Sequence, residues 1–68
     1  MKPSIQNKVQ EYRKITSLTQ AELAEAVGVT RQTIISIEKG NYVPSVALAL
    51  RIAKTLDQKV ETLFLLIK

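Results

Sequence analysis

The sequence contains no cysteine and no histidine. Without thiols the chain has no disulfide framework and no thiolate nucleophile, and without imidazoles it lacks the commonest general base and an ordinary zinc site. Only scattered carboxylates and hydroxyls remain, and they do not form a recognisable set of acid, base and nucleophile. We therefore expect a protein that is not an enzyme and that binds no metal and no cofactor.

Glycine and proline are also scarce, with two of each, and no apolar run approaches the roughly 20 residues of a membrane span. The hydrophobic content of 46% argues against a disordered tail or a low-complexity linker. A chain of 68 residues can bury one core and no more, so residues 1–68 are predicted to form a single domain. The first ten residues are too polar for a signal peptide, and we expect a soluble, cytoplasmic protein with no membrane partner.

Positive charge is in excess, since ten Lys and Arg residues face six Asp and Glu residues for a net charge of +4. Such a balance favours a polyanionic partner, because neutralised phosphates release their counterions. Many small proteins are mildly basic, however, so the position of the charges must decide.

The apolar spacing is helical nearly throughout, which predicts an all-α fold. Thr19 and Glu22 have the spacing of a capping box and indicate a helix over about 19–27, followed by a glycine. Thr30 can cap the next helix over about 30–39, and a second glycine follows that helix too. The two helices are separated by about three residues, which forces a steep crossing typical of a helix-turn-helix.

The crossing sorts the side chains of the second helix into two faces. Ala24 leaves room for its approach, and Val29 and Ile34 can fill the angle between the helices. The shared core is predicted to contain Leu23, Val27, Ile34 and Ile37. The outward side chains are polar or basic: Arg31, Gln32, Thr33, Ser36 and Lys39. Because Arg can pair with guanine and Gln with adenine in the major groove, this face predicts binding to double-stranded DNA.

Two ends of the fold are left open by the sequence. A first helix could open at Pro3, or residues 2–5 could be extended before a helix that starts near Gln6. Ser45 can cap a fourth helix. The final apolar stretch is either a fifth helix or, over residues 65–67, a strand that pairs with residues 2–5. The expected architecture is therefore a compact five-helix domain, with a short terminal β-ribbon as the alternative for its ends.

The chain resembles the Cro/repressor-type, Xre-like family of helix-turn-helix regulators, whose fold is lambda-repressor-like. The likeness is carried by LTQAELAEAVGVTRQTI at residues 18–34, IEKG at 37–40, and a Pro-Ser pair at 44–45. It covers almost the whole chain, and the motifs agree in order and spacing. Short stand-alone members of this family are homodimeric repressors that read palindromic operators and carry no sensor domain.

The resemblance also implies roles for individual residues. The positions expected to read bases are Arg31, Gln32, Thr33 and Ser36. Those expected to contact the DNA backbone are Gln20, Thr30, Lys39 and Asn41. Gln20 would also brace the side chains that read bases. Arg13 and Glu38 are expected to form a structural ion pair between the first helix and the end of the third.

The sequence departs from the family pattern at Ile35 and Val43. Many relatives have a small or polar residue at the first position and a polar one, often Asn, at the second. Ile35 could touch thymine methyl groups or broaden the packing, and Val43 removes a possible hydrogen bond from the loop. Operator preference therefore cannot be borrowed from a relative.

The C-terminal residues 60–68 are predicted to be a dimerisation segment, because the run after residue 62 is too apolar to stay exposed. The residues assigned to the interface are Phe64, Leu65, Leu66 and Ile67. A twofold homodimer would set two reading helices about 34 Å apart, although core packing without a dimer is an alternative.

The competing hypothesis is an antitoxin-like or regulatory subunit with the same fold, which would bind a second protein partner through the apolar C-terminus. It is disfavoured because a module used only for protein contact would not need Arg31, Gln32 and Lys39 on one exposed face.

Overall fold

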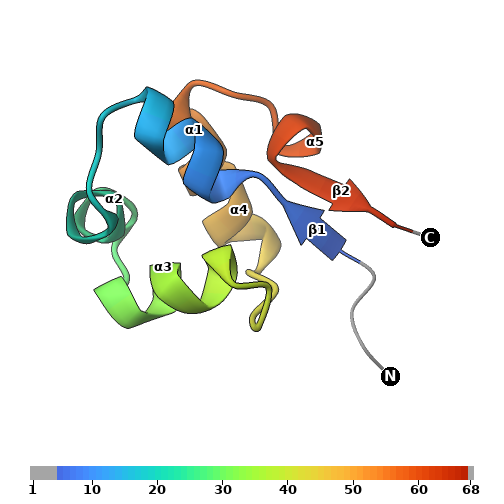
Figure 1. The fold of residues 1–68 in the computed structure, drawn as a ribbon, viewed down its shortest axis with the longest axis horizontal. Coiled ribbons are helices and arrows are strands. Elements are labelled where there is room, and N and C mark those ends of the chain that lie inside the picture. Colours follow the sequence, from blue (N-terminus) through green and yellow to red (C-terminus); the bar gives the residue numbers. More distant parts are fainter. Residues whose placement is uncertain (1–4, 68) are drawn as a thin grey trace.

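The computed structural model describes residues 5–67, which form five helices around one core and a two-stranded ribbon (Figure 1). The elements in chain order are β1 (Ile5–Asn7), α1 (Val9–Ile15), α2 (Gln20–Val27), α3 (Arg31–Glu38), α4 (Val46–Leu56), α5 (Val60–Leu63) and β2 (Phe64–Leu66). The predicted five-helix fold with a helix-turn-helix is confirmed. So is the terminal β-ribbon, which was the alternative for the chain ends.

Every helix contributes to the core. The fully buried side chains are Leu23, Ile34, Ile37, Ile52, Leu63 and Val9. Burying one such side chain stabilises a fold by about 1.5–3 kcal/mol. Two of the six belong to α3, so this helix is held by its apolar face and presents the other face to solvent.

The helix boundaries follow the predicted caps. Thr19 Oγ1 accepts a hydrogen bond from the backbone N–H of Glu22 at 3.0 Å, and Glu22 Oε1 accepts one from the Thr19 N–H at 2.8 Å. At the start of α3, Thr30 Oγ1 accepts from the Thr33 N–H at 3.3 Å. The turn between them passes through Gly28 at φ +79°, in the left-handed region that favours glycine.

The ribbon pairs the two ends of the described chain. β1 and β2 are antiparallel, with Ile5 opposite Leu66, Gln6 opposite Leu65 and Asn7 opposite Phe64. The sequence predicts the first strand at residues 2–5. Only Ile5 of that range lies in β1, and residues 2–4 lie outside the described residues.

The expected start of α1 near Gln6 is wrong, because the helix begins at Val9. The Lys8 N–H donates to the carbonyl of Leu63 at 2.8 Å, which keeps the chain extended up to that point. The hypothesis of a fifth helix running to the end of the apolar stretch is also wrong. Only the four residues of α5 are helical, and the chain continues as a strand.

Candidate nucleic-acid interface

The crossing of α2 and α3 is fixed from both sides. Within the turn, the Val29 N–H donates to the carbonyl of Ala24 at 3.0 Å, and the Val29 side chain packs against the core. From outside the turn, Arg51 Nε of α4 donates to the carbonyl of Val27 at 3.2 Å. Arg51 was missed by the sequence analysis, because nothing local shows that it reaches α2. These contacts set the angle at which α3 leaves the body of the protein.

The residues predicted to read bases lie together on α3. Arg31 and Gln32 are exposed, and Thr33 and Ser36 are partly exposed. They point away from the core because Ile34 and Ile37, on the opposite face of the same helix, are fully buried. The structure therefore presents a mainly polar face on α3, which also includes the partly exposed Ile35.

The start of α3 carries one positive charge and no carboxylate. The first turn contains Arg31 and no acidic residue, whereas the first turn of α2 contains Glu22. A helix start has a partial positive charge, and a cation placed there is unfavourable for the isolated helix. The same arrangement is favourable for contact with a phosphate. The charge at the start of α3 therefore favours binding of a polyanion, although it does not stabilise the helix itself.

A shallow hollow of about 460 Å³ lies beside this face. It is lined by Thr30, Gln32, Thr33, Ser36, Asn41 and Tyr42. Asn41 is predicted to contact the DNA backbone. It lines the same hollow as residues that are predicted to read bases. Tyr42 was missed, although this residue is 47% exposed and its ring has both an apolar face and a hydroxyl. The sequence did carry a signal for Tyr42, namely an aromatic residue two positions after the glycine that follows α3.

Arg13, Glu38 and Gln20 form a hydrogen-bonded network behind α3. Arg13 Nε lies 2.7 Å from Glu38 Oε2, and Arg13 Nη2 donates to Glu38 Oε1 at 3.3 Å. Gln20 Nε2 also donates to Glu38 Oε1, at 3.0 Å. The side chains of Arg13 and Glu38 are 9% and 3% exposed. Because water hardly reaches them, the charge of each is compensated mainly by the charge of the other. The network joins α1, the start of α2 and the end of α3.

Asn7 is a second link to the end of α3, and the sequence analysis did not find it. Its Nδ2 donates to the carbonyl of Ile37 at 2.8 Å, and its Oδ1 accepts from the Val9 N–H at 3.2 Å. One side chain of β1 therefore satisfies the end of α3 and the start of α1 at once. Lys39, which follows α3 as its C-cap, remains exposed.

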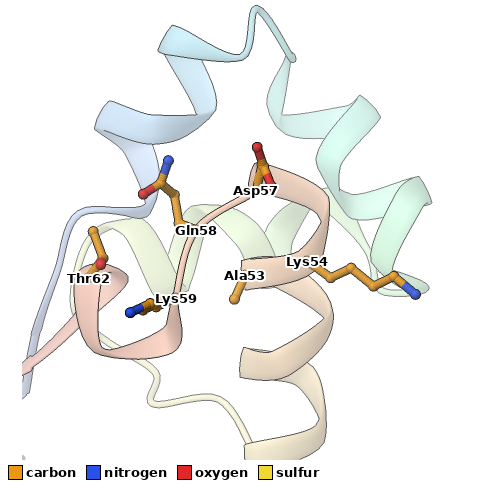
Figure 2. Close-up of a pocket in the computed structure, with 6 residues that line it drawn as sticks. All are labelled: Ala53, Lys54, Asp57, Gln58, Lys59 and Thr62. Atoms are coloured by element: carbon orange, nitrogen blue, oxygen red, sulfur yellow. The ribbon is translucent and has the colours of Figure 1, made fainter.

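A different hollow, of about 580 Å³, lies at the turn between α4 and α5 (Figure 2). Lys54, Asp57 and Lys59 line it, but Figure 2 shows that these side chains point in different directions. The described residues contain no group of three or more carboxylates that could hold a metal ion. They also contain no helix with the length and hydropathy of a membrane span.

Comparison with known proteins identifies relatives over most of the chain. A family model described as helix-turn-helix matches residues 9–63. An uncharacterized HTH-type transcriptional regulator of Methanocaldococcus jannaschii is 51% identical over 61 residues, which cover 90% of this chain and 92% of the relative. The uncharacterized HTH-type transcriptional regulator YgzD of Bacillus subtilis is 52% identical over 60 residues, covering 88% and 91%.

Among solved structures, the fold is similar to the restriction-modification controller protein C.AhdI from Aeromonas hydrophila, with a TM-score of 0.74 and 28% identity. The match covers 79% of this chain and 82% of that protein. Family model, curated relatives and solved structure agree with the α2–α3 geometry. The chain belongs to the helix-turn-helix family of DNA-binding transcriptional regulators, which are not enzymes.

Proposed function

We propose that the protein is a sequence-specific repressor that binds a palindromic operator as a homodimer, with α3 in the major groove. The observation that carries the proposal is the exposed polar face of α3, next to a helix start with positive charge and no carboxylate. A regulator of this kind acts where the operator is, so the proposed location is the cytoplasm.

Within this proposal, the side chains that can reach base edges are Arg31, Gln32, Thr33 and Ser36. Arg31 and Gln32 are the main readers, because each can make two parallel hydrogen bonds to one base. Ser36 and Thr33 lie at the edge of the hollow and supply shorter polar contacts.

The proposed backbone contacts surround these readers: Gln20, Thr30, Lys39, Asn41 and Tyr42. Gln20 Nε2 gives one hydrogen to Glu38, which leaves the other free to donate to a phosphate. The Thr30 hydroxyl is shared with Thr33 across 3.1 Å and can still accept or donate one more bond. Such contacts fix the register of the protein on DNA without reading sequence.

Selection of bound duplexes from a random DNA pool tests the function directly. We expect an enriched motif with two inverted half-sites about one helical turn apart. Enrichment of no motif would contradict sequence-specific reading. A stoichiometric protein partner that co-purifies with a chain lacking DNA affinity would instead favour the protein-interaction hypothesis.

A second measurement addresses the regulatory direction. A promoter that carries the selected motif and drives a reporter should lose expression when the protein is supplied. Increased expression from the same promoter would show activation and would overturn the repressor assignment alone.

A further inference from the structure

The face of α3 that is assigned to DNA also carries an apolar side chain, that of Ile35. Ile35 is partly exposed, whereas Ile34 and Ile37 of the same helix are fully buried. Within the described chain, the partly buried apolar residues that pack against the core are Tyr12, Leu18, Val29, Val60 and Phe64. Ile35 does not belong to that set, so core packing does not account for an isoleucine at this position.

Helical geometry places Ile35 on the outward side of α3. Successive side chains of an α-helix are rotated by about 100°, and the direction midway between Ile34 and Ile37 marks the side of the core. Ile35 and Ser36 then both lie about 130° from the core direction, one on each side of the outward face. Ile35 therefore faces outward as far as Ser36, which is already assigned to base reading.

The neighbours of Ile35 on this face form hydrogen bonds through their side chains, which Ile35 cannot do. It lies one helical turn after Arg31, one turn before Lys39 and three residues after Gln32. Ser36, on the other side of Gln32, lines the polar hollow beside α3, and Ile35 is not one of its lining residues. The outward face of α3 thus has one side with hydrogen-bonding groups and one side with an aliphatic group.

An aliphatic side chain recognises only part of what a base presents in the major groove. The edge of thymine carries an O4 acceptor and a C5 methyl group, whereas cytosine carries an N4 amino donor and no methyl group. Contact between an aliphatic group and the methyl group removes apolar surface of both from water. Against cytosine, the same group covers a donor and offers it no acceptor, which is unfavourable. Thymine is therefore favoured over cytosine for two reasons.

We propose that Ile35 determines specificity by recognising one thymine in each half-site through its C5 methyl group. This inference rests on the proposed binding of α3 in the major groove, and it names a base that this helix prefers. It also decides between the two roles that the sequence leaves open for Ile35. Thr33 carries a competing methyl group, but it lies toward the hollow and its hydroxyl is 3.1 Å from that of Thr30.

Replacing thymine by uracil in the operator tests the proposal, because uracil differs from thymine only by the missing methyl group. Each thymine of the selected half-site is replaced in turn, at the same place in both half-sites, and affinity is measured by equilibrium titration. We expect at least one position at which uracil weakens wild-type binding by about fourfold per half-site, the equivalent of one carbon group kept from water. At that position, Ile35→Ala should bind the thymine and uracil operators equally.

Two variants are matched controls for Ile35→Ala. Ile15→Ala makes the same change at a residue that is 75% exposed at the end of α1, and Thr33→Ser removes only the methyl group of Thr33. Both should keep the preference for thymine at the position where Ile35→Ala loses it. The melting temperature of Ile35→Ala should stay close to that of the wild type. If this variant does not fold, Ile35→Val replaces it and should reduce the preference.

The proposal is overturned by a selected half-site without thymine, or by uracil operators that the wild type binds as well as thymine operators. It is also overturned if Ile35→Ala keeps the preference for thymine. An equal loss of affinity for both operators, with a lower melting temperature, would assign Ile35 to packing. All these results leave sequence-specific binding intact. Selection that enriches no motif would instead contradict the proposed function, and this inference with it.

Discussion

At the scale of single residues, the most specific prediction concerns Arg31 and Gln32. A bidentate pair with one base discriminates by about 1–3 kcal/mol, whereas a phosphate contact is indifferent to sequence. Arg31→Ala and Gln32→Ala should therefore weaken the selected operator strongly and relax preference at one or two base pairs in each half-site. Binding to a scrambled duplex should change much less. Equal losses on both duplexes would show that α3 is not the reader.

Lys39→Ala is the counterpart, because Lys39 is exposed just after α3 and is assigned to a phosphate. It should weaken both duplexes by a similar factor. The slope of log affinity against log salt should become shallower by about one phosphate contact per subunit. Titrations at several salt concentrations measure both effects, and an altered base preference in this variant would contradict the assignment.

Glu38→Gln tests the network behind α3. The amide has nearly the same shape as the carboxylate but leaves the buried Arg13 charge without its counter-charge, and breaking such a pair costs about 3–5 kcal/mol. We expect a clearly lower melting temperature with the same order of preference among operators. Glu25→Gln, at an exposed position of α2, is the control and should melt like the wild type. Unchanged stability together with a new base preference would assign Glu38 to DNA reading instead.

The elements differ in how far the sequence determined them. The starts of α2, α3 and α4 were predicted from Thr19, Thr30 and Ser45, because a capping hydroxyl acts on a backbone N–H three residues away. The start of α1 depends on Leu63 at the other end of the described chain, which no local pattern could show.

The same distinction applies to the candidate site. The polar face of α3 follows from helical periodicity, so Arg31 and Gln32 were found. Asn7 and Arg51 act on α3 and α2 across the tertiary structure, and no spacing in the sequence shows those contacts. Tyr42 carried a local signal, but its place beside α3 depends on how the loop folds back.

Asn7 gives a prediction at the scale of elements, because one side chain joins β1, α1 and α3. Asn7→Asp keeps the acceptor for the Val9 N–H but loses the donor to the carbonyl of Ile37. We expect faster amide exchange at Gly40 and Asn41, whose N–H groups bond to the last turn of α3, and weaker operator binding. The carbonyl of Ile37 would keep only the hydrogen bond from the Gly40 N–H, and the loss of one such bond typically costs about 0.5–1.5 kcal/mol.

Gln6→Glu is the matched control, since it also converts an amide to a carboxylate but at the exposed neighbour in β1. It should leave exchange at the end of α3 unchanged. Equal effects of the two substitutions would show that added charge, and not the lost donor, is responsible.

At the scale of the whole molecule, the proposed dimer fixes the spacing of two reading helices. Inserting two base pairs between the half-sites rotates them by roughly 70° relative to each other, since B-DNA has about 10–10.5 base pairs per turn. A dimer held by one interface cannot follow that rotation without strain. We therefore expect affinity for the altered operator to fall toward that of an isolated half-site, as measured by equilibrium titration. An unchanged affinity would indicate two copies that bind independently.

The terminal ribbon would allow the order of the elements along the chain to be changed by circular permutation. Because Ile5 and Leu66 are strand partners, a short polar linker from Leu66 to Ile5 would not have to span the body of the protein. New ends could then be opened in the exposed turn between α4 and α5, far along the chain from α3. Such a circular permutant should keep the same fold and operator preference.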